Sequence, residues 1–74
     1  MNEPYTELAN AIVMQAVKDW RDAVHKLKKR PRYEPAKEMK DECEEFFLSD
    51  WFTALTSVDG ESILKKLKEE ENIL

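Results

Sequence analysis

Residues 41–64 read DECEEFFLSDWFTALTSVDGESIL, and four aromatic side chains fall within seven of these positions: Phe46, Phe47, Trp51 and Phe52. The rest of the chain supplies only three more aromatic residues. Aromatic side chains bury the largest apolar area per residue. We therefore expect the core to form around this aromatic block. If Trp51 is buried within it, Trp51→Ala should cost about 3–5 kcal/mol of stability.

Length and composition point to one small helical domain. The chain has 74 residues, one Gly and three Pro, and Ala, Leu, Glu and Lys are abundant, as in helical proteins. The single cysteine, Cys43, excludes an intramolecular disulfide and a cysteine-based zinc finger. Stability must then come from packing or from association, which is common for chains of this size.

The first part of the chain predicts one long helix. Pro4 suits a first helical turn, and no residue breaks the pattern before Pro31. Apolar residues recur at steps of three and four: Leu8, Ile12, Val13, Ala16, Val17, Trp20, Val24 and Leu27. Roughly 25 residues at 1.5 Å each give a helix nearly 40 Å long, longer than a compact domain of this size needs. We expect its last turns to project or to meet a second subunit.

Three further helices complete the predicted fold. A short loop over 31–34 and Pro35 lead into a second helix antiparallel to the first. Ser49 or Asp50 should cap a short third helix, and Asp59 a fourth. The fold class expected is all-α, a small helical bundle with a long N-terminal helix, an antiparallel second helix and two short C-terminal helices. It forms a single domain over 1–74, with frayed ends at 1–4 and 69–74.

The charge is unevenly distributed, although the net charge is only −4. Residues 1–33 carry seven Lys or Arg against four Asp or Glu, whereas residues 34–74 carry five against twelve. The basic residues concentrate in the run HKLKKRPR over 25–32, with fixed charges at Lys26, Lys28, Lys29, Arg30 and Arg32. Such a run is typical of a solvated helix end, where cations complement the helix dipole. The alternatives are nucleic-acid contact through these five residues, a localisation signal, or another acidic partner.

A helix-turn-helix interpretation of the two C-terminal helices fits less well. Its recognition helix would offer lysines but would be followed by three consecutive glutamates at 69–71, which would sit badly near phosphates.

Other chemical signals favour structural roles. Four carboxylates share one face of the second helix, which we expect to be solvated because one convex face cannot surround a cation: Glu38, Asp41, Glu42 and Glu45. The segment 50–61 has the length of a calcium loop but places Phe52 and Ala54 where ligands belong. We therefore expect no metal site and no cofactor.

The residues that most often carry catalysis also have structural interpretations here. His25 falls on the polar face of the long helix, where we expect a surface histidine, and Cys43 falls on an apolar stripe as a small buried side chain. Met14 lies on the outer face of the same long helix, an incidental feature or part of a partner-binding face. We expect no enzyme activity and no small-molecule substrate.

Nothing in the sequence predicts membrane insertion. No apolar run approaches the roughly 20 residues that span a bilayer, and the start MNEPYTEL lacks the features of a signal peptide. We expect a cytoplasmic protein.

Two regions of the sequence resemble small proteins encoded in prophages and conjugative transposons of Gram-positive bacteria. The residues that carry the resemblance lie within 5–68: Leu8-Ala9-Asn10-Ala11-Ile12-Val13, Gln15-Ala16-Val17, Glu42-Cys43-Glu44, Phe46-Phe47, Ser49, Trp51-Phe52, Leu55-Thr56 and Asp59-Gly60-Glu61. The resemblance implies a cytoplasmic mobile-element accessory protein and assigns no functional residue. It also argues against a nuclear-localisation signal.

Two functional hypotheses follow. The first is a non-enzymatic protein that binds a protein partner or forms a homo-oligomer, because the first helix has a broad apolar stripe and excess length. The alternative is a DNA- or RNA-binding accessory factor that uses the basic end of that helix.

Overall fold

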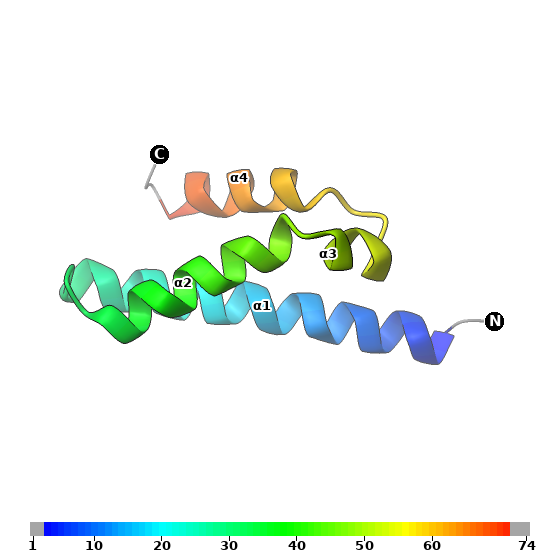
Figure 1. Ribbon diagram of the computed structural model, residues 1–74, viewed down its shortest axis with the longest axis horizontal. Coiled ribbons are helices and arrows are strands. Elements are labelled where there is room, and N and C mark those ends of the chain that lie inside the picture. Colours follow the sequence, from blue (N-terminus) through cyan, green and yellow to red (C-terminus); the bar gives the residue numbers. More distant parts are fainter. Residues whose placement is uncertain (1–2, 72–74) are drawn as a thin grey trace.

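The protein is an all-α bundle of four helices in a computed structural model that describes residues 3–71, with side chains from Glu7 onward. The helices are α1 (Glu3–Lys29), α2 (Glu34–Phe47), α3 (Asp50–Leu55) and α4 (Gly60–Glu70). The molecule is elongated, 45 × 20 × 19 Å, with α1 along its longest axis (Figure 1). The expected fold class and helix order are confirmed.

The first two helices form an antiparallel hairpin because the chain reverses within the short segment 30–33. A hydrogen bond from the backbone N–H of Tyr33 to the carbonyl of Arg30 closes this turn, and Pro35 lies in the first turn of α2. The C-terminal turns of α1 are thus covered by α2, and the N-terminal turns extend beyond the other helices (Figure 1). Our prediction that the last turns of α1 would project was wrong.

Two side-chain caps fix the starts of the short helices. The hydroxyl of Ser49 accepts the backbone N–H of Phe52 at 3.2 Å and donates to the carbonyl of Phe46 at 2.7 Å. The carboxylate of Asp59 accepts the backbone N–H of Glu61 at 3.2 Å. Ser49 rather than Asp50 is therefore the cap of α3, and the predicted cap of α4 is confirmed.

The core lies between α1, α2 and the two short helices. Its largest fully buried side chains are Trp20, Phe47 and Phe52. The rings of Phe47 and Phe52 meet edge to face at 5.7 Å, and Phe46 packs against both. Half of the aromatic block is thus central to the core, but its largest member is not.

Trp51 contradicts the sequence-based prediction because 65% of its surface is exposed. Its neighbour Phe52 is buried, and adjacent residues on a helix point about 100° apart. A short helix that packs by one side can bury only one of them. The tryptophan in the core is instead Trp20, from the middle of α1.

A polar network surrounds the edge of Trp20. Its indole Nε1–H donates to Glu44 Oε2 at 3.1 Å, and the Lys40 ammonium lies 2.7 Å from the same oxygen. Burial alone would raise the pKa of Glu44, but the hydrogen bonds from Lys40 and Trp20 outweigh it and hold that pKa below its usual value. The network therefore satisfies the polar edge of the largest core side chain.

Gly60 brings α4 close to the end of α2. A Cβ at this position would lie 1.7 Å from the carbonyl oxygen of Phe47 and 3.1 Å from the Phe52 ring. Only a residue without a side chain permits this approach of the two backbones. Gly60 is buried at the start of α4, a role that the sequence did not reveal.

Candidate interaction surface

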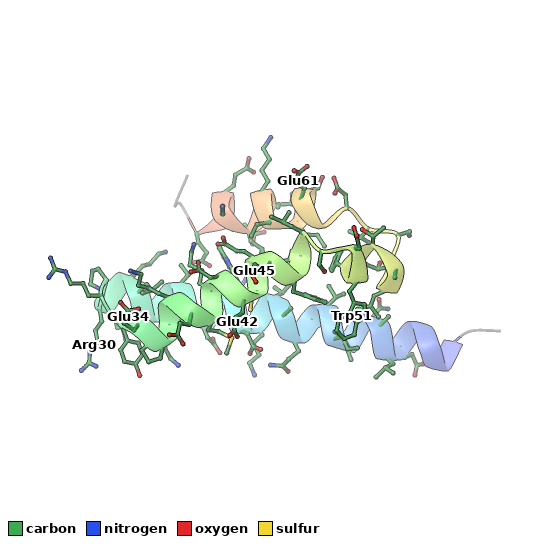
Figure 2. All side chains as sticks on the ribbon, viewed as in Figure 1. Arg30, Glu34, Glu42, Glu45, Trp51 and Glu61 are labelled. Atoms are coloured by element: carbon green, nitrogen blue, oxygen red, sulfur yellow. The ribbon has the colours of Figure 1, made fainter. Side chains whose placement is uncertain are left out.

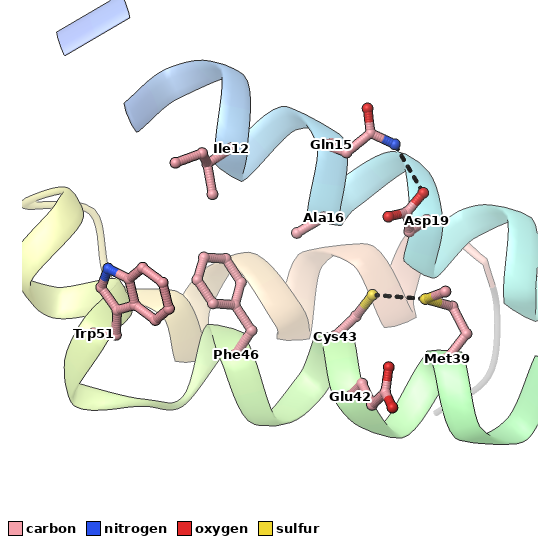
Figure 3. Close-up of a pocket in the computed structure, with 9 residues that line it drawn as sticks. All are labelled: Ile12, Gln15, Ala16, Asp19, Met39, Glu42, Cys43, Phe46 and Trp51. Carbon is pink, nitrogen blue, oxygen red and sulfur yellow. Dashed lines mark hydrogen bonds between the residues drawn. The ribbon is translucent and has the colours of Figure 1, made fainter. Parts of the chain in front are cut away.

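An open apolar groove runs between α1 and α2 and ends at α3. It encloses about 490 Å³, and most of its lining is apolar: Ile12, Ala16, Met39, Cys43, Phe46 and Trp51. Figure 3 shows Ile12 and Ala16 along one wall, with Phe46 and Cys43 along the other. The groove is therefore built by α1 and α2 together, and α3 contributes Trp51.

Trp51 closes one end of this groove. Its ring meets Phe46 edge to face at 6.4 Å, and Figure 3 shows it beside Phe46 on the side facing Ile12. The contact with Phe46 holds the indole over the groove while most of its surface stays in solvent. A large aromatic side chain that is exposed and held in place by a neighbouring ring is typical of a protein-binding surface.

The opposite end of the groove is polar and acidic. Asp19 and Glu42 line it, and Asp19 accepts a hydrogen bond from the Gln15 amide at 2.9 Å. Neither carboxylate lies within ion-pair distance of a basic side chain in the part of the chain that the structure describes. The groove thus has an aromatic end and a negatively charged end.

Cys43 forms part of the groove floor and is buried, as the sequence predicted. Burial, followed by the charges of Asp19, Glu42 and Glu44, raises the pKa of its thiol to about 11. Its Sγ lies 3.9 Å from the sulfur of Met39. A neutral, buried thiol is a packing group and a poor nucleophile.

Two further large apolar residues of α1 are exposed outside the groove. Leu8 is 60% exposed, although the sequence placed it on the packed stripe. Met14 is 68% exposed on the outer face, as expected. Ala9 lies between them in the sequence and is buried, so α1 still packs by one side this close to its N-terminus.

The basic end of α1 is only partly assembled into one site. Lys26, Lys29 and Arg30 surround Tyr33 in a shallow depression of about 270 Å³, and the Arg30 guanidinium lies 5.7 Å from the ring centroid of Tyr33. Arg30 lies at the end where α1 turns into α2 (Figure 2). Lys28 contacts Glu71 instead, and Arg32 is exposed but does not line the depression.

Three basic residues of α1 instead contact the end of α4. Arg21 lies 2.8 Å from Glu70, whereas His25 and Lys28 lie 3.0 and 3.1 Å from the same oxygen of Glu71. The hydrogen bond from Lys28 is the main reason why the pKa of Glu71 lies below its usual range.

These contacts bear on two expectations. His25 is an exposed surface histidine, as expected, and Glu71 reaches it from 46 residues away in the chain. Residues 69–71, which we expected to fray, belong to α4 and its C-cap, and Glu71 is largely buried by its contacts. The expected fraying also covered residues 1, 2 and 72–74, which lie outside the described part of the chain.

The carboxylate face of α2 is solvent-exposed, as expected. Among the described residues, no group of three or more His, Cys, Asp or Glu side chains is placed to hold a metal ion. No helix in the described segment combines the length and the apolar character needed to cross a bilayer.

Two features of the sequence bear on the groove, and only the first entered the sequence-based hypotheses. One is the length mismatch between α1 and α2, 27 residues against 14, which leaves much of α1 without α2 opposite it. The other is the adjacent pair Trp51 and Phe52, which cannot both face the core from a six-residue helix. Together they predict an exposed aromatic residue beside an uncovered helix face.

Comparison of this chain with protein-family models, with curated proteins and with solved structures finds no match.

Proposed function

We propose that the protein is a non-enzymatic accessory protein that acts through protein–protein interaction or self-association at the groove between α1 and α2. The observation that carries this proposal is Trp51, 65% exposed and held by Phe46 over the apolar lining. Burying such a side chain in a partner would remove a large apolar area from water, about 25 cal/mol for each Å². Tryptophan is also among the residues that most often dominate binding energy at interfaces.

The chemistry of the groove supports binding rather than catalysis. Its titratable groups are two carboxylates and one thiol, and the raised pKa of Cys43 keeps that thiol neutral at neutral pH. The groove lining contains no His or Lys that could activate the thiol, and the two carboxylates raise its pKa further.

Light scattering across a concentration series tests self-association. If copies associate through the groove, the mass should rise toward a dimer with concentration, and Trp51→Ala should shift this transition to higher concentration. Leu48→Ala is a matched control, because Leu48 is an exposed apolar residue outside the groove. A monomer at all concentrations would exclude self-association, and the interaction would then have to involve another protein.

The resemblance to proteins of prophages and conjugative transposons supports a role as a cytoplasmic accessory protein of a mobile element. The neighbouring genes test this origin. A terminase, relaxase or repressor gene beside the coding sequence would support it, whereas a conserved position among unrelated housekeeping genes would contradict it.

Nucleic-acid binding at the basic end of α1 is the second candidate function. Its supporting observation is that Lys26, Lys29 and Arg30 gather around Tyr33, exposed and without an ion-pair partner among the described residues. Binding to mixed-sequence duplex DNA should then weaken steeply with salt, and replacing these three by Ala should reduce the slope. Lys65→Ala/Lys66→Ala on the exposed side of α4 serves as a control. Absence of binding at low salt would exclude this function.

A further inference from the structure

We infer that the occupant of the groove is an amphipathic helix of another protein that carries Lys or Arg next to its apolar anchors. This inference rests on the proposed function, because it names the partner chemistry for the same groove. It follows from the length of the groove, the nature of its floor and the charge at one end.

The length of the groove matches the anchors of a helix. Its wall on α1 runs from Ile12 to Asp19, which is about 10 Å along the helix axis. Apolar residues at positions i, i+3 or i+4, and i+7 of a bound helix span the same distance. The occupant therefore needs about two turns of apolar contact, and Trp51 would cover its first anchor.

The charge of the groove favours a basic occupant. Asp19 and Glu42 are the charged residues of the lining, and no Lys, Arg or His lines it. Both carboxylates lack a basic partner within the described residues, so a cation from the occupant would meet them without breaking an existing ion pair. Glu38 and Glu45 on the same helix add negative charge nearby.

A second copy of this chain supplies the wrong charge. The exposed apolar residues that a second copy would present from the N-terminal half of α1 are Leu8 and Met14. This half contains Glu3 and Glu7 but no Lys or Arg before Lys18. Helix α4 carries three lysines but also three glutamates, and its apolar residues Leu64 and Leu67 are buried in the core, so it is not free for this purpose. A partner of different sequence is therefore the better complement.

Two designed peptides of about 16 residues test the inference. Both carry Leu at positions i, i+3 and i+7 of one helical face. The basic peptide has two Lys next to the last Leu, and the acidic peptide has two Glu at the same positions. Binding to the full chain is followed by two-dimensional amide NMR. The indole N–H of Trp51 gives a signal separate from that of Trp20, which is hydrogen-bonded to Glu44.

The basic peptide should shift the signals of the groove, including the Trp51 indole, and bind about three- to tenfold more tightly than the acidic one. This preference should shrink with salt. The double variant Asp19→Asn/Glu42→Gln should abolish the preference. Asp41→Asn/Glu69→Gln makes the same charge change at exposed positions away from the groove and should preserve it. Trp51→Ala should weaken both peptides about tenfold or more. Thermal melting of each variant checks that the fold is retained.

Several results would overturn the inference. Equal or tighter binding of the acidic peptide would exclude the role of Asp19 and Glu42. NMR shifts confined to Glu38, Asp41 and Glu45, outside the groove lining, would exclude the groove as the site. If both peptides bind through Trp51 without charge preference, or if the groove instead joins two copies of the chain, the proposed function stands and this inference fails. If neither peptide binds, this inference fails, and a protein that also stays monomeric excludes the self-association version of the proposed function.

Discussion

The two tryptophans offer a direct test of how this fold is stabilised, because one is fully buried and the other is mostly exposed. Trp20 is 0% exposed, and truncation of such a side chain to Ala costs about 3–5 kcal/mol. The whole domain should have roughly 4–11 kcal/mol of stability, scaled from its length. Trp20→Ala should therefore leave the protein barely folded or unfolded.

Trp51→Ala should have a much smaller effect. With 65% of Trp51 exposed, about a third of a side chain of at most ~250 Å² is buried. At 25 cal/mol for each Å², its removal costs at most about 2 kcal/mol. This value replaces the 3–5 kcal/mol that the sequence suggested.

Urea denaturation followed by circular dichroism measures both variants on one scale. We expect Trp51→Ala to keep the slope of the wild-type transition and to lower its midpoint slightly. Trp20→Phe, which keeps an aromatic ring but loses the donor to Glu44, should lie between the two Ala variants. Equal losses for Trp51→Ala and Trp20→Ala would refute the assignment of Trp51 to the surface and with it the groove.

Three other predictions follow from the core and the groove. Because Glu44 has a lowered pKa in the folded protein, its stabilising contribution is present above about pH 4.5 and is lost as pH falls through the lower folded value. Urea midpoints measured between pH 7 and pH 3 should therefore fall less for Glu44→Gln than for wild type, and an equal fall would contradict the lowered pKa. Gly60→Ala should destabilise the protein by about 1–3 kcal/mol in the same assay, because the added methyl group would force α4 away from the Phe47 carbonyl. An unchanged urea midpoint would disprove this close approach. With a pKa of about 11, Cys43 should react with iodoacetamide at pH 8 on the order of a hundred times more slowly than a free thiol. Unfolding in urea should restore the rate of a free thiol. Rapid labelling of the folded protein would contradict the burial of Cys43.

The order of the helices could be predicted from the sequence because local patterns determine it. Pro31 ends α1, Ser49 and Asp59 accept backbone N–H groups of the helices that follow them, and the apolar spacing marks the faces that pack. Each of these signals acts within a few residues of chain. Sequence alone was therefore sufficient for the fold class and the approximate helix boundaries.

The predicted basic site could be located only in part. All five of its residues lie where the sequence placed them, at the end of α1 and in the following turn. Which of them remain free to bind a partner depends on α4. The side-chain carboxylate of Glu71, the C-cap of α4, binds Lys28, which lies 43 residues earlier in the chain. No local pattern reports that contact.

The candidate interaction surface was decided by tertiary structure. The sequence determined that Trp51 and Phe52 are adjacent on a short helix, but the way in which α3 docks determined that Phe52 is buried and Trp51 is exposed. Likewise, the sequence contained a single glycine, and only the approach of α4 to Phe47 shows why that position requires it. Periodicity identifies the residues that share a face, whereas the distances between packed helices decide which faces meet and which remain free to bind.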